Sequence, residues 1–129
     1  MIPLVVSCPL CGEDLMDNDT LLDGHPSVGV NLLYNGVETP LHLSSIYGSF
    51  RFDTPTAVDI GDVTDILCRH CSQSLVTDTP CEICKANLGR MRMAVDGDVF
   101  FCSRRGCKGH KVELRDLEES LAILYSAES

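Results

Sequence analysis

Cys68-Arg-His-Cys71 and Cys81-Glu-Ile-Cys84 are two C-x-x-C knuckles near the middle of a chain of 129 residues. A third knuckle, Cys8-Pro-Leu-Cys11, lies close to the N-terminus, and Cys102 and Cys107 form a fourth, wider pair. These four pairs use all eight cysteines of the chain. Because a C-x-x-C turn presents two sulfur atoms to one metal ion, this grouping predicts metal sites rather than disulfides.

Eight thiolates are enough for two tetrahedral sites with four ligands each. We expect the pairs to combine in sequence order, giving one site of Cys8, Cys11, Cys68 and Cys71 and a second of Cys81, Cys84, Cys102 and Cys107. The predicted hairpin between Cys84 and Cys102 suits a single ribbon. Two alternatives remain at this point: the central knuckles close a site of their own, leaving the outer pairs to form the other, or the pairs alternate in a crossed brace.

Two zinc ions are the expected cofactors, and both are expected to be structural. Four protein ligands leave no coordination position open for water, so we expect no catalytic residues and no enzymatic activity. Iron in a rubredoxin-like site is the rival, but the later knuckles lack glycine and few aromatic residues are available to cover them. His70 and His110 adjoin the ligands, and we expect them to lie beside the sites rather than to bind metal.

Residues 81–107 resemble the small C-terminal zinc ribbons of bacterial type I topoisomerases, and the first knuckle resembles those of zinc ribbons and rubredoxins. The resemblance rests on Cys81-Glu-Ile-Cys84, Arg90 and Arg92, Asp96-Gly97, Phe100-Phe101-Cys102 and Gly106-Cys107-Lys108. It covers about a fifth of the chain, and it departs from the family at Lys85, where glycine is usual. It implies a metal-built β-ribbon at this end of the protein.

The expected fold is mainly β: two small zinc-ribbon-like four-cysteine modules, with an antiparallel β insert in the first and a C-terminal helix. The first module spans 1–78, with its insert at about 12–67, and the second spans 79–129. Asn35-Gly36 predicts a hairpin between 28–34 and 37–43, and Asp96-Gly97 predicts another. We also expect a strand at 46–52 and a polar loop at 72–80. No repeat longer than the knuckle is apparent.

The C-terminal helix is predicted from apolar spacing. Leucines recur at intervals of three and four residues, at Leu114, Leu117, Leu121 and Leu124. Acidic residues near the expected start of this helix suit the helix dipole.

Charge is unevenly distributed along the chain, whose net charge is −9. Residues 1–84 carry twelve acidic and two basic side chains, whereas residues 85–115 carry eight basic and three acidic ones. Candidate contacts for an anion or a nucleic acid are Arg90, Arg92, Arg104, Arg105, Lys108 and Lys111, with Phe100 or Phe101 stacking on bases. The net negative charge opposes attraction to a polyanion, so a protein partner is preferred.

The chain shows no secretory signal and no apolar run of about 18 residues, so we expect a cytoplasmic protein with no membrane partner. The favoured function is a non-catalytic zinc-binding adaptor module or accessory subunit. A nucleic-acid-binding zinc ribbon is the first alternative, and an iron electron carrier is the second.

Overall fold

Short strands make up the regular structure of the part of the chain that the structure describes. The computed structural model describes residues 3–49, 51–94 and 97–114. Its strands are β1 (Val6–Ser7), β2 (Met16–Leu22), β3 (His25–Tyr34), β4 (Val37–Leu43), β5 (Phe52–Asp53), β6 (Asp65–Leu67), β7 (Val76–Pro80), β8 (Asn87–Met93), β9 (Gly97–Cys102) and β10 (His110–Leu114). No helix occurs among these described residues, and hence none long and apolar enough to cross a membrane.

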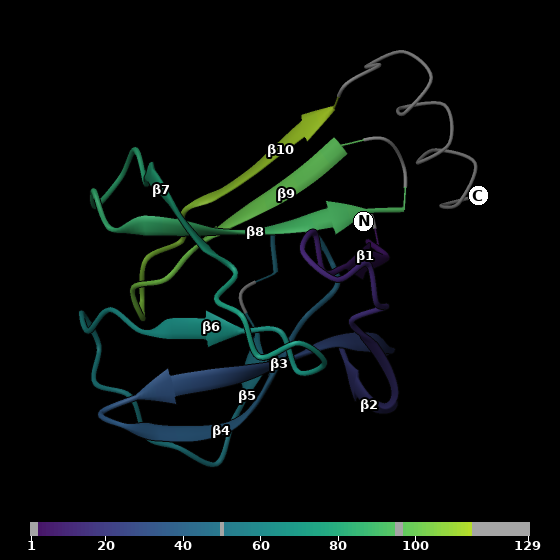
Figure 1. Ribbon diagram of the computed structural model, residues 1–129, viewed down its shortest axis with the longest axis horizontal. Helices are drawn as coiled ribbons and strands as arrows, with labels where there is room; N and C mark the ends of the chain where they lie inside the picture. Colours follow the sequence, from purple (N-terminus) through teal and green to yellow (C-terminus); the bar gives the residue numbers. More distant parts are fainter. Residues whose placement is uncertain (1–2, 50, 95–96, 115–129) are drawn as a thin grey trace.

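The strands form two antiparallel sheets that lie one above the other (Figure 1). One sheet has the order β2-β3-β4-β5, with β6 pairing to β3, and the other has the order β1-β8-β9-β10, with β7 pairing to β8. The first knuckle joins β1 to β2, and the second joins β6 to β7. Each of these knuckles therefore carries the chain from one sheet to the other.

Residues 3–53 and 63–113, called here the N-terminal half and the C-terminal half, follow the same path. Leu15 N donates to Val6 O at 3.1 Å, and Leu75 N donates to Ile66 O at 2.7 Å. Residues of the second half are thus numbered 60 higher than their counterparts around the knuckles. The remaining strands correspond in the same way, with β3, β4 and β5 matching β8, β9 and β10.

Two buried serines show that the correspondence extends beyond the knuckles. Ser45 Oγ donates to Pro26 O at 2.7 Å, and Ser103 Oγ donates to Asn87 O at 2.6 Å. Ser45 O accepts from the N–H of Leu4, and Ser103 O accepts in the same way from Thr64. The chain is therefore an internal structural repeat, which the sequence shows only as Cys-x-x-Cys-x-x-x-Leu at 8–15 and 68–75.

The hydrophobic core lies between the sheets and takes side chains from both halves. Val30, Leu32 and Leu41 come from the first half, and Met91 and Phe101 come from the second. Each of these side chains is at most 6% exposed. Because neither half encloses this core alone, each half stabilises the other.

The hairpin predicted at Asn35-Gly36 is confirmed, since Tyr34 pairs with Val37 across these two residues. Their φ angles are 51° and 78°, as a type I′ turn requires. The strand expected at 46–52 is wrong, because Ile46 makes an isolated bridge, residues 47–48 form a turn, and β5 begins only at Phe52. The loop expected at 72–80 ends in β7, which bonds to β8.

The expected fold class is corrected in two respects. The protein is mainly β, but its strands form two sheets that are connected by the first two knuckles, rather than one separate module around each cysteine group. No helix is present among the described residues. Leu114, the first leucine of the expected helix, instead ends β10, where it pairs with Gly97 of β9. The rest of that expected helix falls in residues 115–129 and lies outside the described residues.

Candidate metal centres

The first cysteine group joins the two halves of the repeat. Cys8 and Cys11 follow β1, Cys68 and Cys71 follow β6, and all four sulfur atoms lie within 4.8 Å of one another. Cys8 Sγ is 3.9 Å from Cys71 Sγ, and Cys11 Sγ is 3.7 Å from Cys68 Sγ. A tetrahedral ion bound at about 2.3 Å requires sulfur atoms about 3.8 Å apart, so this group fits one metal ion.

Backbone N–H groups point at the buried sulfur atoms of this group. Leu10 N and Cys11 N lie 3.3 and 3.4 Å from Cys8 Sγ. Burial acts to raise the pKa of Cys8, but these bonds, together with the thiols of Cys68 and Cys11, outweigh it and lower the pKa to about 7. At Cys68 burial outweighs the backbone bonds and raises the pKa to about 12. One thiol is thus ready to bind a cation near neutral pH, and the other must give up its proton to the incoming ion.

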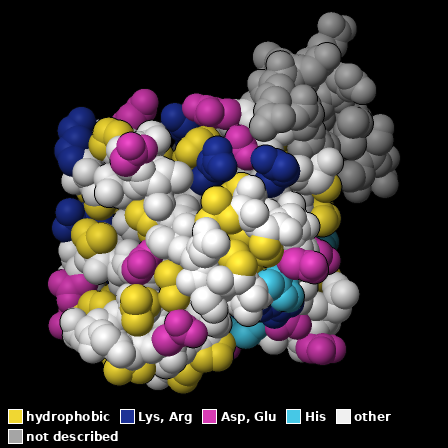
Figure 2. Space-filling view, in the orientation of Figure 1, with side chains coloured by type: hydrophobic (Ala, Val, Ile, Leu, Met, Phe, Trp, Pro, Cys, Tyr) yellow, Lys and Arg dark blue, Asp and Glu magenta, His cyan; other side chains and the backbone are white. Residues whose placement is uncertain are grey.

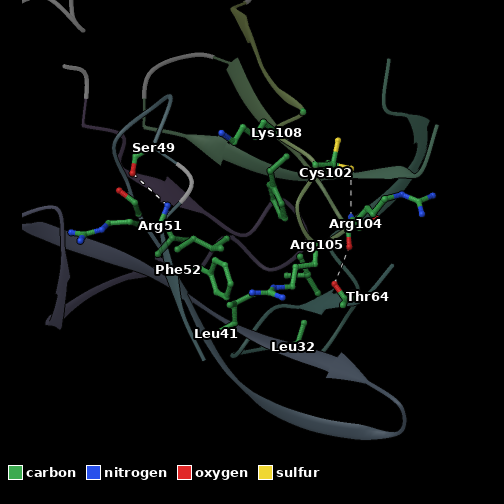
Figure 3. A pocket seen from close by; sticks show the side chains of 18 of the residues that line it. Leu32, Leu41, Ser49, Arg51, Phe52, Thr64, Cys102, Arg104, Arg105 and Lys108 are labelled. Carbon is green, nitrogen blue, oxygen red and sulfur yellow. Dashed lines mark hydrogen bonds between the residues drawn. The ribbon is translucent and has the colours of Figure 1, made fainter. Parts of the chain in front are cut away.

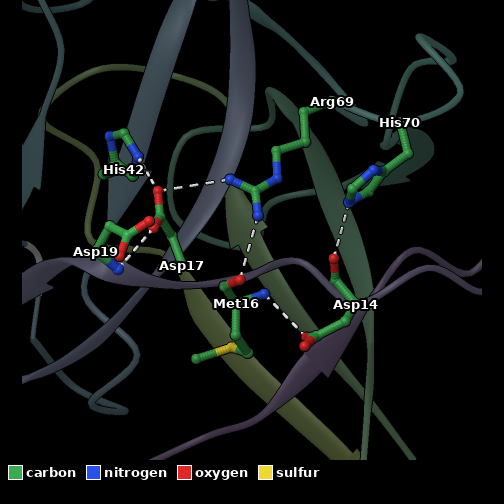
Figure 4. Close-up of polar contacts among 7 residues, drawn as sticks. All are labelled: Asp14, Met16, Asp17, Asp19, His42, Arg69 and His70. Carbon is green, nitrogen blue, oxygen red and sulfur yellow. Dashed lines mark hydrogen bonds and ion pairs between the residues drawn. The ribbon is translucent and has the colours of Figure 1, made fainter.

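Side chains of the second knuckle reach across to the segment that follows the first (Figure 4). Arg69 donates to Met16 O at 3.2 Å and lies 3.5 Å from the Asp17 carboxylate. His70 Nε2 is 2.9 Å from Asp14 O. These contacts bind the two knuckles to each other independently of any metal.

Asp17 also contacts His42, a residue for which the sequence indicated no role. His42 Nε2 lies 2.9 Å from Asp17 Oδ2. A backbone hydrogen bond from Asp19, followed by the contact with His42, lowers the pKa of Asp17. The acidic segment after the first knuckle is therefore held by a hydrogen bond of its own and by contacts with His42 and Arg69.

The second cysteine group lies within the C-terminal half, between the β7–β8 turn and the turn after β9. Cys81 Sγ is 3.7 Å from Cys107 Sγ, and Cys84 Sγ is 3.4 Å from Cys102 Sγ. Leu88 and Phe100 cover this group. Gly109 must be glycine, because a Cβ atom there would lie only 2.5 Å from Cys81 Sγ.

The thiols of the second group also differ in acidity. A backbone hydrogen bond from Ala86 is the main reason that the pKa of Cys84 falls to about 6. Burial raises the pKa of Cys102. The second group therefore repeats the pattern of the first, with one readily ionised thiol beside one that resists ionisation.

The eight cysteines thus form the same two groups as the sequential pairing. His70 is exposed and contacts backbone, and Cys107 stands in the second group. Two groups of four thiols are able to bind metal, and their closed geometry fits zinc-ribbon-like modules.

The cationic side chains singled out in the sequence lie in two places. Arg90 and Lys111 flank Phe100 in register on one face of the second sheet, and Arg92 lies two residues along β8 from Arg90. Arg104, Arg105 and Lys108 lie in the turn after β9. Figure 2 shows Lys and Arg mainly over the second sheet, in the upper part of the view, with acidic side chains spread over both sheets.

Most of these cations already have partners within the protein. Arg104 donates to Gly61 O at 2.8 Å, and Arg105 donates to Val58 O at 2.7 Å. Lys111 lies 3.0 Å from the Glu113 carboxylate and 5.1 Å from the centre of the Phe100 ring. Phe100 and Phe101 are only 7% and 6% exposed.

A cavity of about 360 Å³ between the sheets is the feature that the sequence did not reveal. Apolar side chains of both halves line it, including Leu32, Leu41 and Met91. Arg105 and Phe52 lie together at this cavity, with the guanidinium carbon 5.5 Å from the ring centre (Figure 3). The Cys-x-x-Cys-x-x-x-Leu spacing repeated at 8–15 and 68–75 indicates two related halves, but it does not indicate a cavity between them.

No family model, curated protein or solved structure matches this chain.

Proposed function

We propose that this protein is a non-catalytic binding module in which two zinc ions are structural and the mouth of the cavity takes a protein partner. The observation that carries the metal part is the closed geometry of both cysteine groups. Four thiolates per ion leave no position for water or substrate. The metals therefore serve to hold strands together, and recognition belongs to the surface that they support.

The mouth of the cavity supports a binding role because apolar side chains are exposed there. Ile60 is 78% exposed, Phe52 is 45% exposed and Tyr47 is 38% exposed, and all three line the cavity. Exposed apolar side chains that border a hollow of a few hundred Å³ are typical of binding sites. An apolar anchor side chain of a partner suits the interior of this cavity.

The charge of the mouth suggests the character of that partner. Arg51, Arg105 and Lys108 line the cavity alongside the apolar residues (Figure 3). Arg51 has a side chain that is 71% exposed. A peptide with a large apolar residue flanked by Asp or Glu would complement both the interior and the rim.

The nucleic-acid alternative has weaker support. Phe100 and Phe101 are buried, so neither ring offers a free face on which bases could stack. Arg104 and Arg105 are bonded to backbone carbonyl groups. The Arg90, Arg92 and Lys111 face remains the surface on which this alternative would have to rest.

Elemental analysis and affinity capture test the proposal together. We expect two zinc ions per chain, and a red, iron-containing preparation would contradict the choice of zinc. The wild-type protein, used as bait in an extract of the native host, should capture a partner. The Ile60→Asp variant should not capture it, because this substitution places a negative charge at the mouth. Ile83→Asp is the matched control, since Ile83 is 70% exposed but does not line the cavity. Equal recovery of the partner with Ile60→Asp would contradict this binding surface.

A further inference from the structure

The turn after β4 in the N-terminal half matches the ligand-bearing turn after β9 in the C-terminal half. Ser44 N donates to Arg51 O at 3.0 Å, and Cys102 N donates to Gly109 O at 2.9 Å. Gly48 has a φ of 92°, and Gly106, its counterpart, has a φ of 90°. The two turns therefore share their length, their closing hydrogen bond and their left-handed glycine.

Two serines occupy the positions of two cysteine ligands in this turn. Ile46 N donates to Ser44 Oγ at 3.2 Å, just as the N–H of Arg104 points at Cys102 Sγ. Ser49 N donates to Ile46 O at 3.0 Å, which repeats the 3.2 Å bond from Cys107 N to Arg104 O. Ser44 therefore stands for Cys102, and Ser49 stands for Cys107.

The facing turn is shorter in the N-terminal half. The chain passes from β7 to β8 through the Cys81–Cys84 knuckle, but from β2 to β3 through Asp23-Gly24 alone, with Leu22 paired to His25. Asp23 Oδ2 accepts hydrogen bonds from Ser44 Oγ and Ser49 Oγ, each at 2.6 Å. The carboxylate thus bridges the two serines, as a metal ion would bridge the corresponding thiolates.

Arg51 completes this arrangement and also marks the difference between the halves. Its guanidinium lies 3.4 Å from Asp23 Oδ1. The counterpart of Arg51 is Gly109, where even a Cβ atom would collide with Cys81 Sγ. A long side chain is accommodated at 51 because the two-residue turn brings no thiolate to this place.

We propose that the turn at 44–51 keeps the frame of a latent third metal site, in which hydrogen bonds from Ser44 and Ser49 to the Asp23 carboxylate close the turn that a metal ion closes in the other half. The native side chains hold the frame without a metal. Restoring the knuckle and the thiols should restore metal binding. The inference rests on the proposed function only in treating the second cysteine group as a metal site.

A graft tests the latent site by gain of a metal. Residues 22–25 are replaced by the sequence of 81–86, Cys-Glu-Ile-Cys-Lys-Ala, together with Ser44→Cys, Ser49→Cys and Arg51→Gly. We expect the metal content to rise from two to three ions per chain. In the cobalt-substituted protein, the absorption of tetrahedral thiolate-bound cobalt should rise about 1.5-fold in proportion.

The matched control carries the same graft and Arg51→Gly but keeps Ser44 and Ser49, and we expect it to stay at two ions. A folded full graft that still binds only two ions would overturn the latent site. If the graft does not fold, a single substitution in the native protein tests the inference instead.

That smaller change is Asp23→Asn, which weakens the acceptor shared by the two serines. The N–H groups of Ser44, Ile46 and Ser49 should exchange with deuterium about tenfold faster, while those of Cys102, Arg104 and Cys107 keep their rates. Asp53→Asn, at an exposed carboxylate on β5, should change neither set. Unchanged exchange at 44–49 would overturn the inference. A metal-free native protein would contradict the proposed function but leave this result intact.

Discussion

The two halves of this protein share one backbone path and differ in what closes their outer ends. In the N-terminal half a two-residue turn brings one carboxylate against two hydroxyls. In the C-terminal half a longer knuckle brings two thiols against two others. The longer turn costs only about 1 kcal/mol more in loop-closure entropy, so both closures serve turns of similar energetic cost. The comparison teaches that hydrogen bonds to one carboxylate close, in the N-terminal half, the place where the C-terminal half puts four thiols able to bind a metal ion.

The cysteine groups differ in a second way, because the first group belongs to both halves and the second belongs to one. Cys68→Ser should therefore have the largest effect. Apparent zinc-binding free energies of about 10–16 kcal/mol exceed the whole stability of most small domains, and serine is a poor replacement for a thiolate ligand. We expect Cys68→Ser to lose cooperative thermal unfolding at 25 °C and above.

Cys84→Ser provides the comparison for that variant. It removes a ligand that serves the C-terminal half alone, so we expect it to retain one metal ion and a cooperative, weakened transition. Elemental analysis and thermal unfolding followed by circular dichroism measure both outcomes. Greater disruption by Cys84→Ser than by Cys68→Ser would contradict the shared role of the first group.

Two glycines on corresponding strands should tolerate a methyl group unequally. A Cβ at Gly89 of β8 would lie 2.4 Å from Cζ of the buried Phe101 ring, so the ring or the strand would have to shift. A Cβ at Gly29 of β3 would meet only the far end of the long Arg69 side chain, at 2.5 Å, which can shift at the cost of weakening its contacts with Met16 and Asp17. We expect Gly89→Ala to cost about 2–3 kcal/mol and Gly29→Ala less than about 1 kcal/mol in urea unfolding. Equal costs would show that the Phe101 ring yields as readily as Arg69.

Local signals in the sequence account for the parts of the structure that local chemistry determines. The Asn35-Gly36 hairpin follows from turn geometry, and the sequential grouping of the cysteines was favoured because a hairpin was expected between Cys84 and Cys102. The pairing of β1 with β8 and of β6 with β3 joins residues far apart in the chain. No local pattern specifies such pairing, so the shared core and the cavity were not foreseen.

The repeat leaves little trace in the sequence for a different physical reason. Ser44 and Cys102 differ in chemistry but accept the same backbone N–H, so the shared feature is a hydrogen-bond geometry rather than a residue type. The spacing of Leu114 to Leu124 predicted a helix. Leu114 instead pairs with β9, because an open strand edge offers its backbone hydrogen bonds.

Substitutions at one position of the knuckle turns should have smaller effects on stability. The residue four positions after the first cysteine has a positive φ in each case: 78° at Gly12, 62° at Ser72 and 71° at Lys85. Only glycine adopts this conformation without strain. We expect Lys85→Gly to stabilise the protein by about 0.5–1 kcal/mol and Gly12→Ala to destabilise it by a similar amount, as measured by urea unfolding. A destabilised Lys85→Gly would mean that the lysine side chain contributes a contact that outweighs its backbone strain.

The smallest expected effect is a dependence on pH that belongs to the N-terminal half. Hydrogen bonds from Ser44 and then Ser49, with the charge of Arg51, lower the pKa of Asp23 below its ordinary value. A carboxyl group whose pKa is lower in the folded protein stabilises it above the unfolded pKa of about 4 and loses that contribution as the pH falls through the folded value.

The melting temperature of Asp23→Asn should therefore lie below that of the wild type at neutral pH. The difference should narrow as the pH falls below about 4, because the wild-type carboxylate is then protonated as well. Thermal unfolding of both proteins across this range measures the difference. A constant difference would show that Asp23 acts through its shape rather than its charge, and closure of this turn by an ionised carboxylate would then have to be abandoned.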